Sequence, residues 1–243
     1  MAINSIDLEG LFINIYSINI FEREEIKMMK VYFDCEFTGL TKNCDLISIG
    51  LVSETGQGFY AEFMDYDEDK ILDKKWMNFN VINNLFLKAN EEDFEIITRD
   101  RPYSIFFKRD DGYWIKNALL DWFNGLKESK LNRNEIQLYS DCSHFDFVLF
   151  LSLFGSALDL PEFISPVCHD INLDIANYLD IPESEAFDIS RNRLVSSFPF
   201  KDRLIENLEE VLSLKAKGLL SQHNSFVDAL EIARIERGIK HNS

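Results

Sequence analysis

The order of apolar segments in the first third of the chain is the feature that most constrains its fold. Residues 31–36, 46–52 and 59–63 each have the composition of a strand, and a Thr-Gly-Gln-Gly turn joins the last two. Three consecutive strands this close in sequence predict an antiparallel meander. Strands and helices then alternate along the chain, so we expect an α/β fold in which the meander and a later parallel part share one mixed sheet.

The remaining segments complete this prediction. Residues 135–140 and 167–170 are predicted as the fourth and fifth strands, and the almost wholly apolar segment 145–154 predicts a buried helix. Other helices are expected over residues 71–90, 114–126, 173–179, 203–217 and 225–237. Residues 91–111 are expected to be polar and irregular. The predicted fold is a central mixed five-stranded sheet flanked by helices.

A single domain is expected over 29–243. Residues 1–28 do not resemble the start of a domain, and two Met residues precede the first predicted strand. We interpret 1–28 as an N-terminal extension or a start codon assigned too far upstream, and an extra strand or helix packed on the sheet is the alternative. The domain is predicted to carry an insertion at about 181–217, which holds two prolines.

The chain is strongly acidic, with 42 acidic and 25 basic side chains and a formal net charge of −17. This charge argues against broad binding to a nucleic-acid duplex, which relies on many Lys and Arg contacts to phosphates. It is compatible with clustered carboxylates that hold divalent cations, although solubility explains most of it. The four cysteines form no C-x-x-C pair, so a reduced cytoplasmic setting is expected. No apolar run is long enough to cross a bilayer, and no membrane partner is expected.

An acid pair closes the first predicted strand. Asp34 and Glu36 lie two residues apart, so their side chains share one face of the strand and Cys35 points to the other. Two neighbouring carboxylates repel each other unless a cation lies between them, and such hard oxygen ligands suit Mg²⁺ or Mn²⁺. Pairs of this kind also occur on solvated strand faces, but the apolar residues before this pair indicate a central strand.

A turn made by Phe37, Thr38, Gly39 and Leu40 comes next. The glycine would let the backbone approach a ligand closely, and the leucine could wedge against a nucleobase. An ordinary turn that ends a strand is the alternative, and the four residues by themselves favour it.

A third acid opens the apolar helix predicted over 145–154. Asp146 would either face the acid pair as a metal ligand or be a first-turn acid that the helix dipole stabilises. Asp141 could be a hydrogen-bonding neighbour and His144 a phosphate contact. A surface role is the simpler interpretation of both.

The last motif precedes the helix predicted over 225–237. Asn224 or Ser225 can cap this helix, which leaves Asp228 in its first turn. His223 lies on the lead-in to the helix, and a His near its usual pKa suits a general base at neutral pH. Taken alone, a His and an Asp at this spacing would more often reflect the capping of a helix than a functional site.

Together, the four motifs resemble the DnaQ-like (DEDDh) 3′–5′ exonucleases. That pattern is D-x-E followed by a T-G-L-like turn, N-x-x-x-F-D before a helix, and H-x-x-x-x-D at the last helix. The residues that match it here are Asp34, Glu36, Asp146, His223 and Asp228. The resemblance covers about 30–237. Around the first strands, the sequence looks most like the small bacterial 3′–5′ exoribonucleases of the RNase T group.

The sequence departs from this pattern in three places. Asp141 stands where the pattern usually has Asn, and Phe37 stands where a small polar residue is common. The segment 181–217 is longer than in compact members. These departures concern substrate contacts rather than the metal centre.

The resemblance implies an RNase H-like fold and a metal-dependent 3′–5′ exoribonuclease. Such an enzyme releases nucleoside 5′-monophosphates from single-stranded or 3′-overhang RNA. Asp34, Glu36, Asp146 and Asp228 would hold two Mg²⁺ or Mn²⁺ ions, with His223 as the general base. A DNA-directed exonuclease, a non-catalytic nucleic-acid or protein-binding module and a metal-free scaffold are the alternatives. By analogy with related enzymes, a homodimer is also expected.

Overall fold

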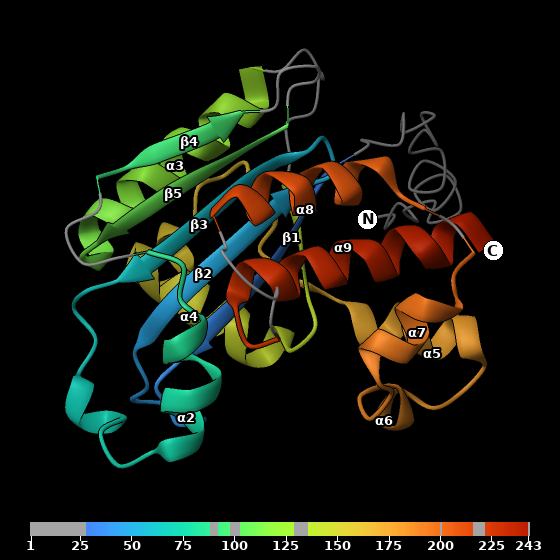
Figure 1. Cartoon of the computed structure of the whole chain (residues 1–243), viewed down its shortest axis with the longest axis horizontal. Coiled ribbons are helices and arrows are strands. Elements are labelled where there is room, and N and C mark those ends of the chain that lie inside the picture. Colours follow the sequence, from blue (N-terminus) through green and yellow to red (C-terminus); the bar gives the residue numbers. More distant parts are fainter. Residues whose placement is uncertain are drawn as a thin grey trace, which may run out of the picture.

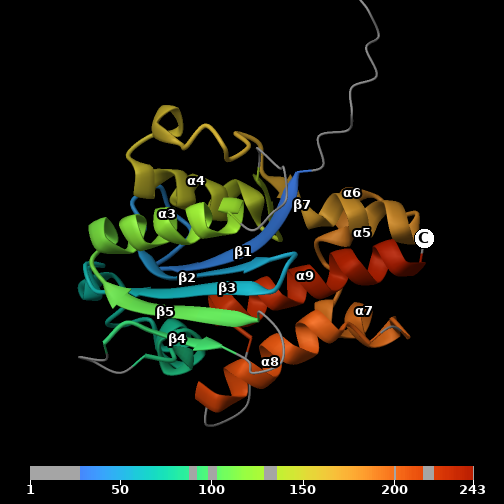
Figure 2. The same ribbon diagram turned by 90° about the horizontal axis from the view of Figure 1, so that it is seen from above.

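A mixed sheet runs through the middle of the molecule and carries helices on both faces (Figures 1 and 2). The structure, a computed structural model, describes residues 28–87, 92–97, 103–128, 136–199, 201–215 and 222–242. In this part of the chain the sheet has seven strands, in the order β4-β5-β3-β2-β1-β6-β7. Their bounds are β1 (Met29–Phe37), β2 (Leu46–Ser53), β3 (Gln57–Phe63), β4 (Phe94–Ile97), β5 (Ser104–Asp110), β6 (Ile136–Ser140) and β7 (His169–Asp170). The predicted extension at 1–28 lies outside the described residues, except for Met28.

The first three strands form the predicted antiparallel meander, and β6 pairs in parallel with β1. In the β1–β2 register, Val31 lies opposite Ser53 and Asp34 lies opposite Gly50. All the residues of β2 are buried, because helices cover both faces of the sheet. The α/β class and the mixed sheet that the sequence predicted are therefore confirmed.

Two pairs of helices enclose the sheet (Figure 2). α3 (Gly112–Glu128) and α4 (Ser143–Phe154) lie on one face, and α8 (Arg203–Lys215) and α9 (Ser225–Asn242) lie on the other. Along β1 the side chains alternate between two cores. Phe33 and Cys35 pack in the α3–α4 layer, whereas Tyr32 packs in the α8–α9 layer. Because alternate residues of a strand share a face, Asp34 and Glu36 belong to the α9 side.

The helix α9 is fixed to β1 near its far end. The Tyr32 hydroxyl donates to Glu236 Oε2 at 2.8 Å, and Lys30 forms an ion pair with the same carboxylate. Tyr32 and Glu236 are 204 residues apart in sequence. The contact therefore joins an early strand to a late helix.

The predicted number of strands is wrong, because the segment expected to be irregular contains two more. β4 and β5 pair antiparallel, and β5 pairs in parallel with β3. Ile105 and Phe107 are buried, as the alternation of a strand requires, but charged residues follow them directly. Lys108 forms ion pairs with Asp93 at 2.7 Å and with Asp110 at 3.2 Å. These pairs let the strand continue through a charged stretch that, in the sequence alone, indicates a loop.

The helix predicted over 71–90 is broken into short pieces. α2 (Lys75–Asn80) covers only six residues, and 3₁₀ turns flank it at Glu68–Lys70 and Ile82–Asn84. No side chain caps the start of α2. The amides of Asn78 and Asn80 donate to backbone carbonyls four residues earlier, and such local bonds compete with the helix.

The described part of the predicted insertion at about 181–217 contains α6 (Glu183–Ala186), α7 (Arg191–Ser197) and α8. α6 and α7 gather beside α9 together with α5 (Ile171–Leu179), the helix that precedes the insertion (Figure 1). α8 packs against β5 and buries Leu204, Ile205 and Leu208 in the core. The bounds of the insertion and the single domain stay predictions.

All four cysteines, Cys35, Cys44, Cys142 and Cys168, are free. Within the described residues, no helix combines the length and the apolar composition needed to span a membrane. The cytoplasmic location stays a prediction.

Candidate active site

Asp34 and Glu36 come from the end of β1, on the face that α9 covers. Asp34 lies opposite Gly50 of β2, and Glu36 lies opposite Ser48. Cys35, between them, is buried in the other layer. The two carboxylates therefore lie on the side of the sheet where α9 begins.

The glycine at position 50 lets α9 begin directly on the sheet. A Cβ there would lie 2.4 Å from backbone atoms of Phe226, so any side chain at this position would force the helix away. The hydroxyl of Ser48, also on β2, forms a hydrogen bond of 2.9 Å with the hydroxyl of Ser225, the first residue of α9. These two contacts hold the first turn of α9, with Asp228 in it, over β2.

Asn224 caps α9 and ties it to the segment after α2. Its Oδ1 accepts hydrogen bonds from the backbone N–H groups of Phe226 at 3.1 Å and Val227 at 3.4 Å. Its Nδ2 donates to the backbone oxygen of Asn84 at 2.8 Å and to the Tyr60 hydroxyl at 3.2 Å. Of the two caps that the sequence allowed, Asn224 is the one that forms.

Asp146 reaches the same site from α4. It lies in the first turn of the helix and is 1% exposed. Its Oδ2 accepts a hydrogen bond of 2.5 Å from the hydroxyl of Ser140, the last residue of β6. Because β6 runs parallel to β1, the ends of both strands and the start of α4 meet at one edge of the sheet.

The carboxylates at this edge repel one another. Burial, together with the charges of Asp146, Asp228 and Glu36, raises the pKa of Asp34 well above its ordinary value. Burial, Asp228 and Asp146 raise the pKa of Glu36 to about 9. Burial also raises the pKa of Asp228 to about 8 and the pKa of Asp146 to about 7, although the hydrogen bond from Ser140 opposes the latter. Acids shifted in this way hold protons that a divalent cation would displace.

His223 lies beside these acids. Its backbone is left-handed, with φ of 64°, and its N–H donates to Asp228 Oδ2 at 2.9 Å. Its ring packs edge-on against Trp76, with 4.9 Å between the ring centroids. Partial burial lowers the pKa of the imidazole, which favours the neutral form that can accept a proton.

The donor set fits a hard divalent cation. Glu36, His223 and Asp228 each offer a ligand atom, and these atoms lie within 4.8 Å of one another. Asp34 and Asp146 add two more carboxylates, whose charges act on the same group. Carboxylate oxygens suit Mg²⁺ or Mn²⁺, and the raised pKa values indicate that ionising these acids together is unfavourable unless a cation lies between them.

Of the five residues predicted for metal binding and catalysis, Glu36, His223 and Asp228 have ligand atoms within 4.8 Å of one another, and Asp34 and Asp146 interact with these acids through their charges. The roles of the five residues stay predictions.

The residues predicted to contact substrate are placed less uniformly. Leu40 is 69% exposed, and His144 is exposed at the start of α4. Thr38 is buried, and its hydroxyl accepts a backbone hydrogen bond of 2.9 Å within the turn. Phe37 and Gly39 are partly buried, and a substrate role for these residues stays a prediction.

Several residues at the site were missed by the sequence analysis. Ser140 holds Asp146, and Trp76 packs on His223. Asn84 bonds to the residues on both sides of His223: its side-chain amide donates to the Gln222 backbone oxygen, and its backbone oxygen accepts from the Asn224 side chain. Arg191 binds Asp141 from the predicted insertion. Trp76 has no distinguishing signal in the sequence, because its segment holds other large apolar residues such as Met77 and Phe79. The others act through contacts distant in sequence or are too common to be informative.

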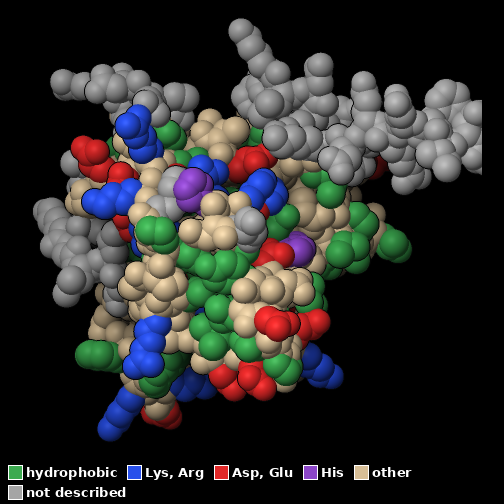
Figure 3. Space-filling view, turned by 90° about the vertical axis from the view of Figure 1, so that its right-hand side faces the viewer, with side chains coloured by type: hydrophobic (Ala, Val, Ile, Leu, Met, Phe, Trp, Pro, Cys, Tyr) green, Lys and Arg blue, Asp and Glu red, His purple; other side chains and the backbone are tan. Residues whose placement is uncertain are grey.

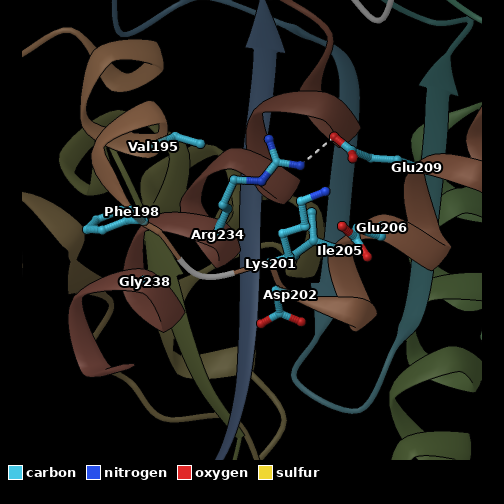
Figure 4. A pocket seen from close by; sticks show the side chains of 9 residues that line it. All are labelled: Val195, Phe198, Lys201, Asp202, Ile205, Glu206, Glu209, Arg234 and Gly238. Carbon is cyan, nitrogen blue, oxygen red and sulfur yellow. Dashed lines mark hydrogen bonds and ion pairs between the residues drawn. The ribbon is translucent and has the colours of Figure 1, made fainter. Parts of the chain in front are cut away.

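A separate pocket of about 190 Å³ lies between α8 and α9 (Figure 4). An ion pair of 2.5 Å between Arg234 and Glu209 crosses its wall. Its lining residues are Val195, Phe198, Lys201, Asp202, Ile205, Glu206, Glu209, Arg234 and Gly238. None of the five converging residues lines it, so it is not part of the candidate site.

No protein-family model matches this sequence, and no curated protein sequence matches it. The nuclease domain of 3′hExo, a DEDDh family member solved bound to rAMP, is similar in structure. Its TM-score is 0.50 at 17% sequence identity, and the match covers 88% of this chain and 92% of that chain.

Two further structures are also similar. One shows 3′-end specific recognition of the histone mRNA stem-loop by a 3′-exonuclease, with a TM-score of 0.47, 14% identity, and coverage of 96% of this chain and 70% of that chain. The other is a full-length 3′-exonuclease, with a TM-score of 0.44, 14% identity, and coverage of 88% of this chain and 82% of that chain.

The likeness to the 3′hExo domain shows that this chain has the RNase H-like fold of a DEDDh nuclease domain. The predicted resemblance is confirmed at the level of the fold. The closer likeness to the bacterial RNase T group stays a prediction.

Proposed function

We propose that this chain is a divalent-metal-dependent 3′–5′ exonuclease that acts on the 3′ ends of RNA. The observation that carries the proposal is the clustering of Glu36, Asp228 and His223, with Asp34 and Asp146 beside them. These residues come from β1, α4 and α9, three stretches that are distant in sequence. The fold shared with a DEDDh nuclease domain supports the same proposal.

In this proposal the chain's own residues divide the work. Asp34, Glu36 and Asp228 would hold two divalent ions at the end of β1, and Asp146 would complete the ligand set from α4. When bound, such ions stabilise charge on the scissile phosphate and lower the pKa of the attacking water. His223, neutral and anchored to Asp228 through its N–H, accepts the proton from that water. The product released is a nucleoside 5′-monophosphate.

A short single-stranded 3′ end is the substrate that the surface suits best. The net charge of −17 disfavours long contacts with a phosphate backbone. On the face shown in Figure 3, Lys and Arg side chains lie interspersed with Asp and Glu side chains. The similar 3′hExo domain was solved with rAMP, a ribonucleotide, which favours RNA over DNA.

Digestion of matched oligonucleotides tests the proposal. A 3′-overhang RNA and a DNA of the same sequence are incubated with the protein and Mn²⁺, and released mononucleotides are measured over time. The expected result is release of 5′-monophosphates from the 3′ end of the RNA, abolished by Asp34→Ala. A 5′-end label distinguishes this product pattern from endonuclease cleavage.

The alternatives give different results in the same assay. Faster degradation of the DNA would overturn the assignment to RNA and keep the exonuclease. Mn²⁺ binding without nucleotide release from either strand would indicate a non-catalytic binding module. A protein that binds no divalent ion in calorimetry would be a metal-free scaffold.

A further inference from the structure

We propose that Arg191 is a positioning residue that balances the charge of Asp141 at the edge of the candidate metal site. Through this balance it sets the relative affinity for divalent cations and for an anionic nucleic-acid end. The inference rests on the proposed function, and it assigns a role to the segment that was predicted as an insertion.

Two nitrogens of the Arg191 guanidinium group, Nε and Nη2, bind the Asp141 carboxylate. Nε donates to Asp141 Oδ2 at 2.9 Å, and Nη2 donates to Asp141 Oδ1 at 2.5 Å. The Arg191 side chain is 11% exposed and that of Asp141 is 31% exposed. A paired, largely buried bidentate contact of this kind is stronger and more directional than a surface ion pair.

Other bonds fix the guanidinium where it is. Nη1 of Arg191 donates to the backbone oxygens of Ala186 at 2.9 Å and Ile189 at 3.1 Å, at the turn between α6 and α7. Nη2 also donates to Asn172 Oδ1 at 2.6 Å, and the amide of Asn172 donates to the backbone oxygen of Asp141 at 2.7 Å. The cation is thus built into a network that spans α5, α7 and the end of β6.

The charge of Asp141 acts on the candidate metal site. Asp141 directly follows Ser140, the last residue of β6, whose hydroxyl donates to Asp146 at 2.5 Å, so it lies at the edge of the sheet where the acids meet. In keeping with this position, its negative charge is among the causes that raise the pKa values of Asp34, Asp146 and Asp228. It also raises the pKa of Glu231, which lies one turn after Asp228 on α9. Asp141 therefore belongs electrostatically to the same acidic group, although it is not among the predicted ligands.

Arg191 opposes that charge from the same position. Its positive charge lowers the pKa of Glu231, against the effect of Asp141. The Asp141–Arg191 pair has a net charge of zero, so the two residues together add no net charge beside the site.

Removing one member of the pair shifts two affinities in opposite directions. Arg191→Gln leaves an extra negative charge beside the carboxylates, which strengthens Mn²⁺ binding and weakens binding of a nucleic-acid end. Asp141→Asn leaves an extra positive charge and has the reverse effect. In the double variant both charges are gone, and both affinities return toward those of the unmodified protein. General damage to the fold would instead weaken both.

The experiment measures Mn²⁺ binding by calorimetry without nucleic acid, and KM for a 3′-overhang oligonucleotide in parallel. For Arg191→Gln we expect the Mn²⁺ dissociation constant to fall and KM to rise, each by about threefold or more, as for one unit charge at a partly solvated site. Arg193→Gln is the matched control, since it removes the same charge from an exposed position on the same helix. It should change neither quantity.

Three outcomes would overturn the inference. The first is weaker Mn²⁺ binding by Arg191→Gln. The second is a double variant whose Mn²⁺ affinity and KM stay at the values of Arg191→Gln. The third is a change of both quantities by Arg193→Gln that equals the change by Arg191→Gln. If Arg191→Gln does not fold, Asp141→Asn carries the test alone, and it must weaken Mn²⁺ binding and lower KM. Charge-dependent Mn²⁺ binding without nucleotide release by any variant would overturn the proposed exonuclease and keep the charge balance. No Mn²⁺ binding by the unmodified protein would overturn both.

Discussion

A Cβ at Gly50 would lie 2.4 Å from the backbone of Phe226, so helix and sheet touch at this point without an intervening side chain. Gly50 is also the register partner of Asp34. This close contact of α9 with the sheet therefore occurs beside the first acid of the site, and it fixes where Asp228 can lie. Four predictions follow from this site and its supports.

Gly50→Ala should displace the start of α9, lower the unfolding temperature and weaken Mn²⁺ binding. Overpacking a buried position costs about 1–3 kcal/mol. Thermal unfolding and calorimetry with Mn²⁺ provide the two measurements. Gly125→Ala is the control, because a Cβ at Gly125 in α3 has no atom within 4 Å, and Ala there should stabilise by about 0.5–1 kcal/mol. Unaltered Mn²⁺ binding by Gly50→Ala would contradict the argument.

The metal-free protein should become less stable as pH rises. The pKa values of Asp146, Asp228 and Glu36 in the folded state are about 7, about 8 and about 9, well above the unfolded values of about 4. Folding therefore takes up protons between these values. The associated stability is fully present below about pH 4 and is lost as pH rises through about 7 to 9.

Thermal unfolding with a chelator at a series of pH values checks this dependence. The unfolding temperature should fall between about pH 6 and about pH 9, and saturating Mg²⁺ should reduce the fall because the ion favours ionised carboxylates. A metal-free protein that gains stability over this range would show that the acids are not clustered as described.

Asn224→Ala should destabilise the protein by about 0.5–2 kcal/mol, the usual effect of losing an N-cap. Asn224→Asp keeps the accepting oxygen of the cap but loses the amide that donates to the Asn84 backbone. Urea unfolding of the two variants therefore separates the cap from the tie to the segment after α2. Equal stability of Asn224→Ala and the unmodified protein would mean that the cap does not hold α9 in place.

His223→Ala should lower kcat by about 10²–10⁴-fold, the usual contribution of a general base, and change KM much less. Steady-state digestion of the RNA oligonucleotide gives both constants. Trp76→Phe serves as a milder comparison, because a smaller ring can still pack beside His223, and it should retain most of the activity. An unchanged kcat for His223→Ala would remove the proposed base.

The acids of the site could be predicted from the sequence because local rules place them. Asp34 and Glu36 share a face by the alternation of a strand, and Asp228 follows a helix cap at Asn224 by a fixed number of residues. The apolar residues of β1, α4 and α9 indicate which elements are central. Where the sequence pattern alone identifies a strand or helix, the functional residues at its end can be predicted as well.

The supports of the site could not be predicted, because they join residues without a local signal. The contact of Arg191 with Asp141 spans 50 residues, and neither residue indicates the other. The strand β5 was missed for a related reason: besides Asp110 on the same strand, Lys108 is neutralised by Asp93, a partner that only the folded chain supplies. The homodimer, the cytoplasmic location and the preference for RNA remain predictions.

The docking of α9 on β2 at its start and on β1 near its far end has a consequence for synthesis of the protein. The ribosome makes Asp34 and Glu36 long before it makes His223 and Asp228, and the Tyr32–Glu236 contact closes over 204 residues. A nascent chain therefore carries Asp34, Glu36 and Asp146, three of the four acids, before the histidine that would activate water is made. Under the proposed function, such a chain cannot degrade the messenger RNA from which it is being translated until α9 has emerged and docked.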